Sequence, residues 1–307
     1  MRKGEISRAG WAALLHLLAA AVSVGAQAQS PANDSGGIRS NGSYLHSYLK
    51  EPKPETPCPP NIDAIYRADV IVTGTDMRQR PWGFAQTLRT VLVKSSGDPR
   101  LKDDPRAEQL AAQADSLVAC FDYVDMMAGT PLHDEQGTYD RPHKLTVTFD
   151  PAKIDAILAQ FGDKPWRGER PVVVPVLLVH GPKPPAYVLS AENPAGAEQR
   201  GAFATAAGEF GLEARIPSDS ELTAWKISAE HFPLREASPP TGDKPGETIV
   251  LGTLVWDETL PGWVGKWRLR WHRVDHDWSI SGVNYDAAFR NIVQGVMLLA
   301  SGRGSPD

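Results

Sequence analysis

Apolar residues recur with two periods along this chain, and these periods predict a mixture of strands and helices. Strands are predicted at residues 68–74, 144–149, 171–179 and 212–216. The third is an almost unbroken apolar run, typical of a strand covered on both faces, but Pro175 inside it favours an edge position or a bulge. Apolar residues at helical spacing, with N-caps at Asp150 and Ser218, predict helices over residues 81–94, 106–117, 151–161, 197–210 and 218–225.

The C-terminal part carries the clearest pattern. Residues 248–256, 265–274 and 278–283 predict three antiparallel strands, and Asn284 caps a final amphipathic helix that ends at Gly302. To bury the apolar side of the middle strand, we expect a four-residue loop at 274–277 that places Trp271 opposite Ile280.

These elements predict an α/β (α+β) fold with two mixed-sheet lobes. We expect the lobes at residues 63–190 and 191–302, followed by a short tail at 303–307. Residues 29–62 are rich in Ser, Gly, Asn and Pro and predict a disordered tether without a packed core.

The first 28 residues predict the location of the protein. Arg2, Lys3 and Arg8 precede an apolar run, and Ala26-Gln27-Ala28 offers a small-residue cleavage site. This order is typical of a secretory signal peptide, and the run is short for a bilayer crossing. We therefore expect a periplasmic protein that keeps no transmembrane anchor after cleavage. A retained anchor helix is the alternative.

The net charge of the chain restricts the kinds of partner that it can bind. The formal charge of the whole chain is −5, and removal of residues 1–28 takes away a net two positive charges, which leaves −7. An acidic protein lacks the basic field that nucleic acid binding requires, so we expect no nucleic acid partner.

Two cysteines, Cys58 and Cys120, follow the predicted cleavage site. An oxidising periplasm favours a disulfide between them. Spacing alone does not bring their Cβ atoms together, so a free Cys58 beside a buried Cys120 is the alternative.

A basic strand face is the predicted binding surface. Side chains alternate across a strand, so the tryptophans of the middle strand point to one face and a basic set points to the other. The basic set consists of Lys266, Arg268, Arg270 and His272. The alternatives are a docking surface for an acidic partner and a solvated face neutralised by local carboxylates such as Asp257 and Glu258.

Candidate reaction centres are mostly excluded by their surroundings. His180-Gly181 after an apolar strand is similar to the turn before a hydrolase oxyanion hole, but no G-x-S-x-G follows. His272 and His276 straddle a predicted strand and turn, so they need not converge on a metal. No phosphate-binding glycine loop and no CxxC occur, and we expect no cofactor.

Two weaker sites are left open. Aromatic residues near strand ends are sugar platforms or core packing: Trp166, Trp263 and Trp267. A polar loop is either solvated or a metal site, with candidate ligands His133, Asp134, Glu135, Asp140 and His143.

Four stretches in order carry a family resemblance: 88–98, Phe149-Asp150-Pro151, Trp166 with Arg170-Pro171, and 262–267. With these stretches the chain resembles an uncharacterised proteobacterial family of exported proteins, domain of unknown function 2066. The resemblance spans most of residues 66–300 and implies a periplasmic α/β protein with no assigned activity, so it carries over no catalytic residues. The C-terminal elements also resemble, in topology, small α/β modules of envelope assembly proteins.

The leading functional hypothesis is a non-enzymatic binding or scaffold module of the cell envelope. The alternatives are a hydrolase of envelope glycans and a small-ligand carrier. The hydrolase would draw its acids from a carboxylate set: Asp257, Glu258, Asp275 and Asp277.

Overall fold

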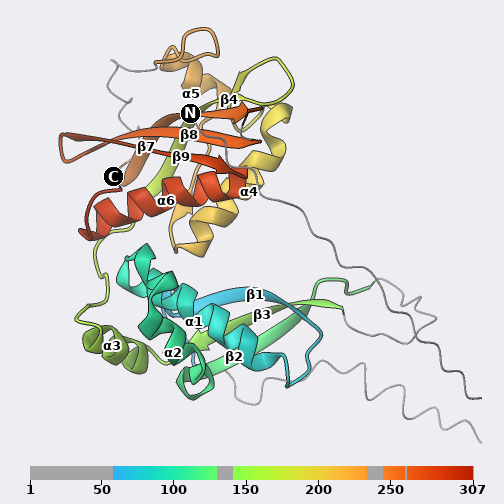
Figure 1. Ribbon diagram of the computed structural model, residues 1–307, viewed down its shortest axis with the longest axis vertical. Coiled ribbons are helices and arrows are strands. Elements are labelled where there is room, and N and C mark those ends of the chain that lie inside the picture. The colour runs from blue at the N-terminus through green and yellow to red at the C-terminus, as the bar shows by residue number, and fades with distance from the viewer. Residues whose placement is uncertain (1–57, 130–140, 234–244, 260, 307) are drawn as a thin grey trace, which may run out of the picture. The chain divides into compact units, whose positions relative to one another are not determined.

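A computed structural model describes residues 58–129, 141–233, 245–259 and 261–306. The predicted signal peptide and most of the predicted tether lie outside the described residues. Within these ranges the chain forms two β-sheets and six α-helices (Figure 1), which confirms the predicted α/β class. None of the described helices is both long enough and apolar enough to span a membrane.

The first sheet holds three strands: β1 (Arg67–Thr73), β2 (Val118–Asp125) and β3 (Pro142–Phe149). Their order is β1-β3-β2, and both pairs are antiparallel. The first sheet is therefore antiparallel, whereas a mixed sheet was predicted. Strand β2 was not predicted, and it begins directly after the residue at which the predicted helix over 106–117 was expected to end. The helix itself is shorter, because α2 ends at Ala111.

Three helices accompany this sheet: α1 (Arg80–Ser96), α2 (Pro105–Ala111) and α3 (Pro151–Gln160). Asp104 and Asp150 cap α2 and α3, and each is followed by proline in the first turn, as helix starts favour. α1 ends at Gly97, whose φ of 75° suits glycine. Its apolar stripe packs against β1 and β3 in the first part of the core: Phe84, Leu88, Val91, Leu145, Val147 and Phe149. Three short 3-10 helices complete this region: η1 (Ala64–Tyr66), η2 (Pro99–Asp103) and η3 (Ala114–Leu117).

The second sheet is mixed and has six strands: β4 (Val172–His180), β5 (Tyr187–Val188), β6 (Glu213–Ala214), β7 (Glu247–Asp257), β8 (Gly262–Trp271) and β9 (Val274–Val283). The order is β5-β4-β7-β8-β9, with β6 also on β4. β4 runs parallel to β7, and β7, β8 and β9 form the predicted antiparallel segment. On its other side β4 pairs β6 at Val173 and β5 at Leu178, and Pro175 lies in the interval between them.

Helices lie on both faces of the second sheet. α4 (Ala197–Glu209), which follows the 3-10 helix η4 (Pro194–Gly196), and α6 (Tyr285–Ser301) cover one face (Figure 1). α6 buries the predicted stripe, including Phe289 and Ile292, which confirms the amphipathic final helix. The short α5 (Asp219–Ala224), closed by a capping box at Ser218, packs on the other face in a separate cluster: Val174, Val176, Leu178, Leu222, Ile227, Ile249 and Leu251.

The hairpin between β8 and β9 differs from the prediction. Trp271 pairs with Val274, so the turn is the two residues His272 and Arg273 rather than a loop at 274–277. Both turn residues have positive φ, 47° and 70°, as a primed hairpin turn demands. Neither is glycine or asparagine, so the usual turn signal is missing. The register therefore shifts, and Gly265 rather than Trp271 lies opposite Ile280.

The boundary between the two sheets differs from the predicted lobe boundary at residue 190. β4 and β5 belong to the second sheet, so the sheets divide the chain between α3 and β4 and not at residue 190. The two parts share one core, and the described residues from Cys58 onward form one compact unit. The predicted tail is also anchored, because Arg303 forms an ion pair with Asp163 and donates to the Ser96 carbonyl at 3.3 Å.

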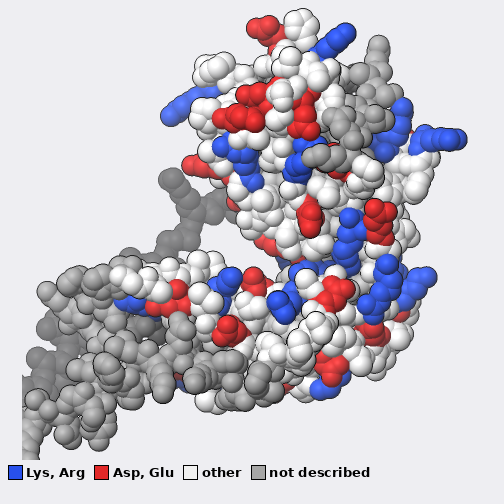
Figure 2. Space-filling model, turned by 180° about the vertical axis from the view of Figure 1, so that it is seen from behind, with Lys and Arg blue, Asp and Glu red and all other residues white. Residues whose placement is uncertain are grey.

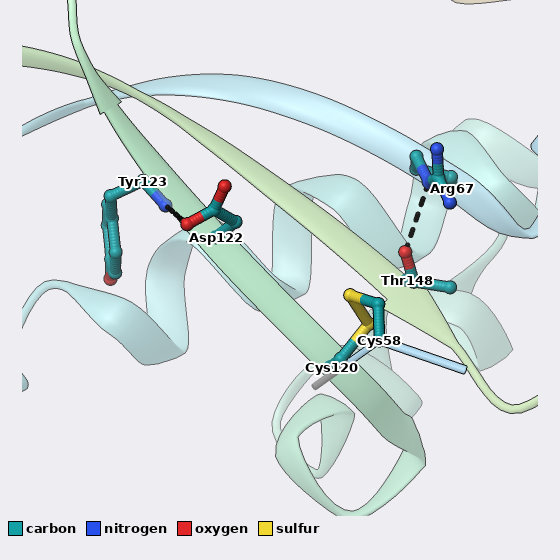
Figure 3. The surroundings of a disulfide bond; sticks show 6 residues. All are labelled: Cys58, Arg67, Cys120, Asp122, Tyr123 and Thr148. Carbon is teal, nitrogen blue, oxygen red and sulfur yellow. Dashed lines mark hydrogen bonds between the residues drawn. A yellow bond between two sulfur atoms is a disulfide. The ribbon is translucent and has the colours of Figure 1, made fainter. Parts of the chain in front are cut away.

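A disulfide joins Cys58 to Cys120, with an S–S distance of 1.95 Å and a Cα–Cα distance of 5.1 Å (Figure 3). Cys120 lies opposite Thr148, which lies opposite Arg67, so one row across the sheet carries the bridge. The Arg67 guanidinium donates to the Thr148 hydroxyl at 3.2 Å. The bond ties the start of the described chain to edge strand β2.

Candidate functional site

The face of the second sheet that carries α5 is divided into two halves. Its β4 half is apolar and is covered by α5 and the segment that follows. Its β8 and β9 half carries the predicted basic residues and their acidic neighbours. At the boundary between the two halves, polar side chains lie next to an accessible apolar surface.

A groove of about 370 Å³ lies at this boundary. Its apolar surface comes from Leu178 on β4 and from Leu251 and Val255 on β7, and Phe232-Pro233 forms one lip. The polar groups along it come from four strands: His180, Thr253, Lys266, Arg268 and Asp277. The volume falls within the range of small-ligand pockets.

The predicted basic face is largely neutralised within the sheet. Arg268 and Arg270 lie directly opposite Asp277 and Asp275. Arg268 donates to Asp277 at 2.9 Å, and Arg270 donates to Asp275 at 2.7 Å. The neutralising acids thus lie on the neighbouring strand β9, although residues 274–277 were predicted to form a loop. On the molecular face drawn in Figure 2, blue and red side chains are likewise interspersed.

The other two predicted basic residues, Lys266 and His272, lie in different places. His272 lies in the hairpin turn, where its ring contacts Trp271, and it does not line the groove. Lys266 is exposed, lines the groove, and has no ion-pair partner among the described residues. The predicted set of four therefore contributes two side chains to one site, Lys266 and the paired Arg268.

Two polar residues outside that set join Lys266. Thr253 lies directly opposite Lys266, and His180 lies opposite Val255, two positions further along β7. Side chains two residues apart on a strand share a face, so an imidazole, a hydroxyl and an ammonium group line one groove. The sequence had marked His180 through its His-Gly turn, but nothing marked Thr253, because strand pairing alone brings it there.

Three of the four carboxylates named for hydrolysis, Asp257, Asp275 and Asp277, are held by hydrogen bonds or ion pairs. The Arg270 side chain, through its hydrogen bond and its charge, lowers the pKa of Asp275, whereas a general acid requires a raised pKa. Asp257 accepts hydrogen bonds from the Thr259 backbone N–H at 2.8 Å and hydroxyl at 2.6 Å. These carboxylates stabilise a turn and an ion-pair ladder.

The tryptophans named for sugar binding pack in the core. Trp166, Trp263 and Trp267 are all at most 8% exposed. The Trp267 indole N–H donates to the Asn291 side chain on α6 at 3.0 Å. All three residues are therefore buried and offer no exposed platform for a sugar.

The candidate metal ligands fall into two groups. His133, Asp134, Glu135 and Asp140 lie outside the described residues, and His143 contacts the Arg141 carbonyl at 2.9 Å. His276 contacts the Ser305 hydroxyl at 3.3 Å, away from the turn that holds His272. Within the described ranges, no three His, Cys, Asp or Glu side chains are grouped so that they could hold a metal.

The junction of the two sheets collects residues from the noted sequence stretches. The Arg170 guanidinium lies 4.0 Å from the Trp166 ring centre and donates to the Lys94 carbonyl at 2.7 Å. The Lys94 ammonium donates to the Arg67 carbonyl at 2.8 Å, and burial lowers its pKa. Gly97 packs so closely that an added Cβ would lie 2.5 Å from Ser301. These residues are explained by packing.

A second groove, of about 350 Å³, lies between α1 and β2 beside the disulfide. Phe84 and Phe121 contribute its aromatic surface, with ring centres 5.3 Å apart. The Arg80 guanidinium lies over the Phe121 ring at 4.6 Å. This groove holds fewer hydrogen-bonding side chains than the groove on the second sheet.

Comparison with known proteins gives a family match for the first part of the chain. Residues 61–167 match a family model described as Domain of unknown function (DUF8605), which covers less than half of the chain. The match coincides with the first sheet and its helices and ends before β4. The resemblance to domain of unknown function 2066 was therefore wrong. No curated protein and no solved structure matched the chain.

Proposed function

We propose that this protein is an exported, non-enzymatic binding module of the cell envelope, and that the groove on the second sheet is its binding site. The observation that carries the proposal is the convergence of His180, Thr253 and Lys266 beside an apolar surface. A few convergent polar groups in an apolar groove are the usual composition of a binding site. The groove lies outside the stretch that the family model covers.

Export is supported by two independent features. The N-terminal sequence has the order of a signal peptide, and the disulfide between Cys58 and Cys120 suits an oxidising compartment. A rigid sheet with helices on both faces is a suitable support for a binding surface, because sites on strands are held more precisely than sites on loops.

A small-ligand carrier is the second candidate. The groove volume of about 370 Å³ is compatible with it, because that volume lies within the range of small-ligand pockets. Partner size distinguishes the two candidates.

Site-specific photocrosslinking in intact cells tests the proposal. p-Benzoylphenylalanine replaces Val255, which is 38% exposed in the groove, or Val274, which is 55% exposed outside it, as the matched control. We expect a discrete protein adduct from position 255 and none from position 274. The crosslinked protein, once purified, should bind the wild type and not Val255→Arg. Equal labelling from both positions, or none from 255, would contradict the proposal.

A further inference from the structure

We propose that the groove recognises a carboxylate side chain flanked by apolar residues, presented by an extended segment of a partner protein. The inference rests on the proposed function and adds the chemistry of the partner. The inference depends on which side chains of the groove can donate hydrogen bonds to a ligand.

Lys266 supplies the positive charge. Arg268 and Asp277 also line the groove, but they bind each other at 2.9 Å and cancel. Lys266 lies opposite Ser279 on β9 and Thr253 on β7, so neither neighbouring strand offers it a carboxylate in register. The remaining local charge is therefore positive, on a chain whose formal charge is −5.

Thr253 and His180 supply hydrogen bonds beside that charge. Side chains directly opposite on antiparallel strands have Cβ atoms ~5 Å apart, so the Thr253 hydroxyl and the Lys266 ammonium can reach one carboxylate together. A carboxylate has two oxygens and accepts several hydrogen bonds, which matches a cluster of donors. His180 on β4, opposite Val255, adds an imidazole to the same groove.

The apolar part of the groove fits the residues on either side of that carboxylate. Leu178, Leu251 and Val255 lie beside the polar cluster, and Phe232-Pro233 closes one side. Successive side chains of an extended peptide point in opposite directions, so an acidic residue and its neighbours can reach different parts of the groove. A free acetate ion would satisfy the donors and leave this apolar surface open to water.

Methyl NMR of the exported protein with a matched pair of probes tests the inference. The probes are the capped peptides acetyl-Leu-Asp-Leu-amide and acetyl-Leu-Asn-Leu-amide, which differ only in the charge and one polar group. We expect the Asp peptide to shift the methyl signals of Leu178, Leu251 and Val255 and to bind about five- to tenfold more tightly than the Asn peptide. Higher salt should reduce that preference.

Two variants assign the preference. Lys266→Gln should bring the two peptides to equal affinity. Lys144→Gln is the matched control, because Lys144 is also exposed in the middle of a sheet face, on β3 of the first sheet, and it should leave the preference unchanged. Unchanged methyl spectra of both variants without peptide show that each still folds.

Each remaining outcome has a distinct meaning. Equal shifts from both peptides would overturn carboxylate recognition and leave the groove as a binding site. No shift of the groove methyl signals at 10 mM peptide would also overturn the inference. The proposed function is tested separately, by the crosslink at position 255.

Discussion

The disulfide between Cys58 and Cys120 is predicted to stabilise the fold by restricting the unfolded chain. Cys58→Ser removes it while Cys120 keeps its own packing, since Cys58 is exposed and Cys120 is only 3% exposed. The sequence separation is 62 residues. In the chain-entropy model a loop of that length restricts the unfolded state by about 4 kcal/mol, and we expect Cys58→Ser to lose most of it.

Urea unfolding followed by tryptophan fluorescence measures this loss. The midpoint should fall, and the slope m should rise, because the unfolded chain without the crosslink exposes more surface. Reduction of the wild type with dithiothreitol should reproduce the Cys58→Ser curve, and dithiothreitol should not change the variant. The double variant Cys58→Ser/Cys120→Ala measures the packing of the Cys120 side chain separately.

A small effect would refute this reasoning. If Cys58→Ser costs less than about 1 kcal/mol and leaves m unchanged, the bond does not restrict the unfolded state as the entropy model requires. If reduction destabilises the wild type but the variant is as stable as the oxidised protein, serine has introduced a compensating contact.

Three further predictions concern the two sheets. Burial, together with the hydrogen bond to Asp155 and its charge, raises the pKa of Tyr66 from 10.0 to about 12, so stability present below pH 10 should be lost as pH rises to about 12. Tyr66→Phe should remove that pH dependence in urea unfolding, and the difference in absorbance at alkaline pH should show one tyrosine ionising near pH 12. Gly265→Ala should cost about 2 kcal/mol in unfolding free energy, because its Cβ would lie 2.1 Å from the buried Trp267 ring. Gly201→Ala in α4 is the control, with nothing within 4 Å, and should stabilise by about 0.5–1 kcal/mol; equal effects of the two would contradict the packing around Trp267. His272→Asn with Arg273→Gly should raise the free energy of unfolding by about 1 kcal/mol, because both residues occupy positive φ, and a lower free energy of unfolding would contradict the two-residue turn.

Strong local patterns made much of the fold predictable. The N-cap Asp150 before Pro151 defines α3, and the stripe through Phe289 and Ile292 defines α6. Both signals lie within a few residues of the element that they specify. Helix caps and one-sided burial can therefore be predicted without knowledge of the rest of the molecule.

Pairing between strands was less predictable. Asp275, His276 and Asp277 have loop-like polarity, yet they belong to β9, because Arg268 and Arg270 on β8 neutralise the two acids. A strand whose polar residues are satisfied by a neighbouring strand lacks the hydrophobic signal of a buried one. The same reason hid Thr253 from the candidate site, since its importance depends on which residue of β8 it faces.

The most direct test of the central claim, that the groove on the second sheet binds an acidic partner segment, combines crosslinking with one charge change. The photocrosslinking residue at position 255 is placed in the otherwise wild-type protein and in the Lys266→Gln and Lys144→Gln variants. The adduct should fall severalfold with Lys266→Gln and stay unchanged with Lys144→Gln. An adduct that is equally strong in all three proteins would contradict recognition through Lys266.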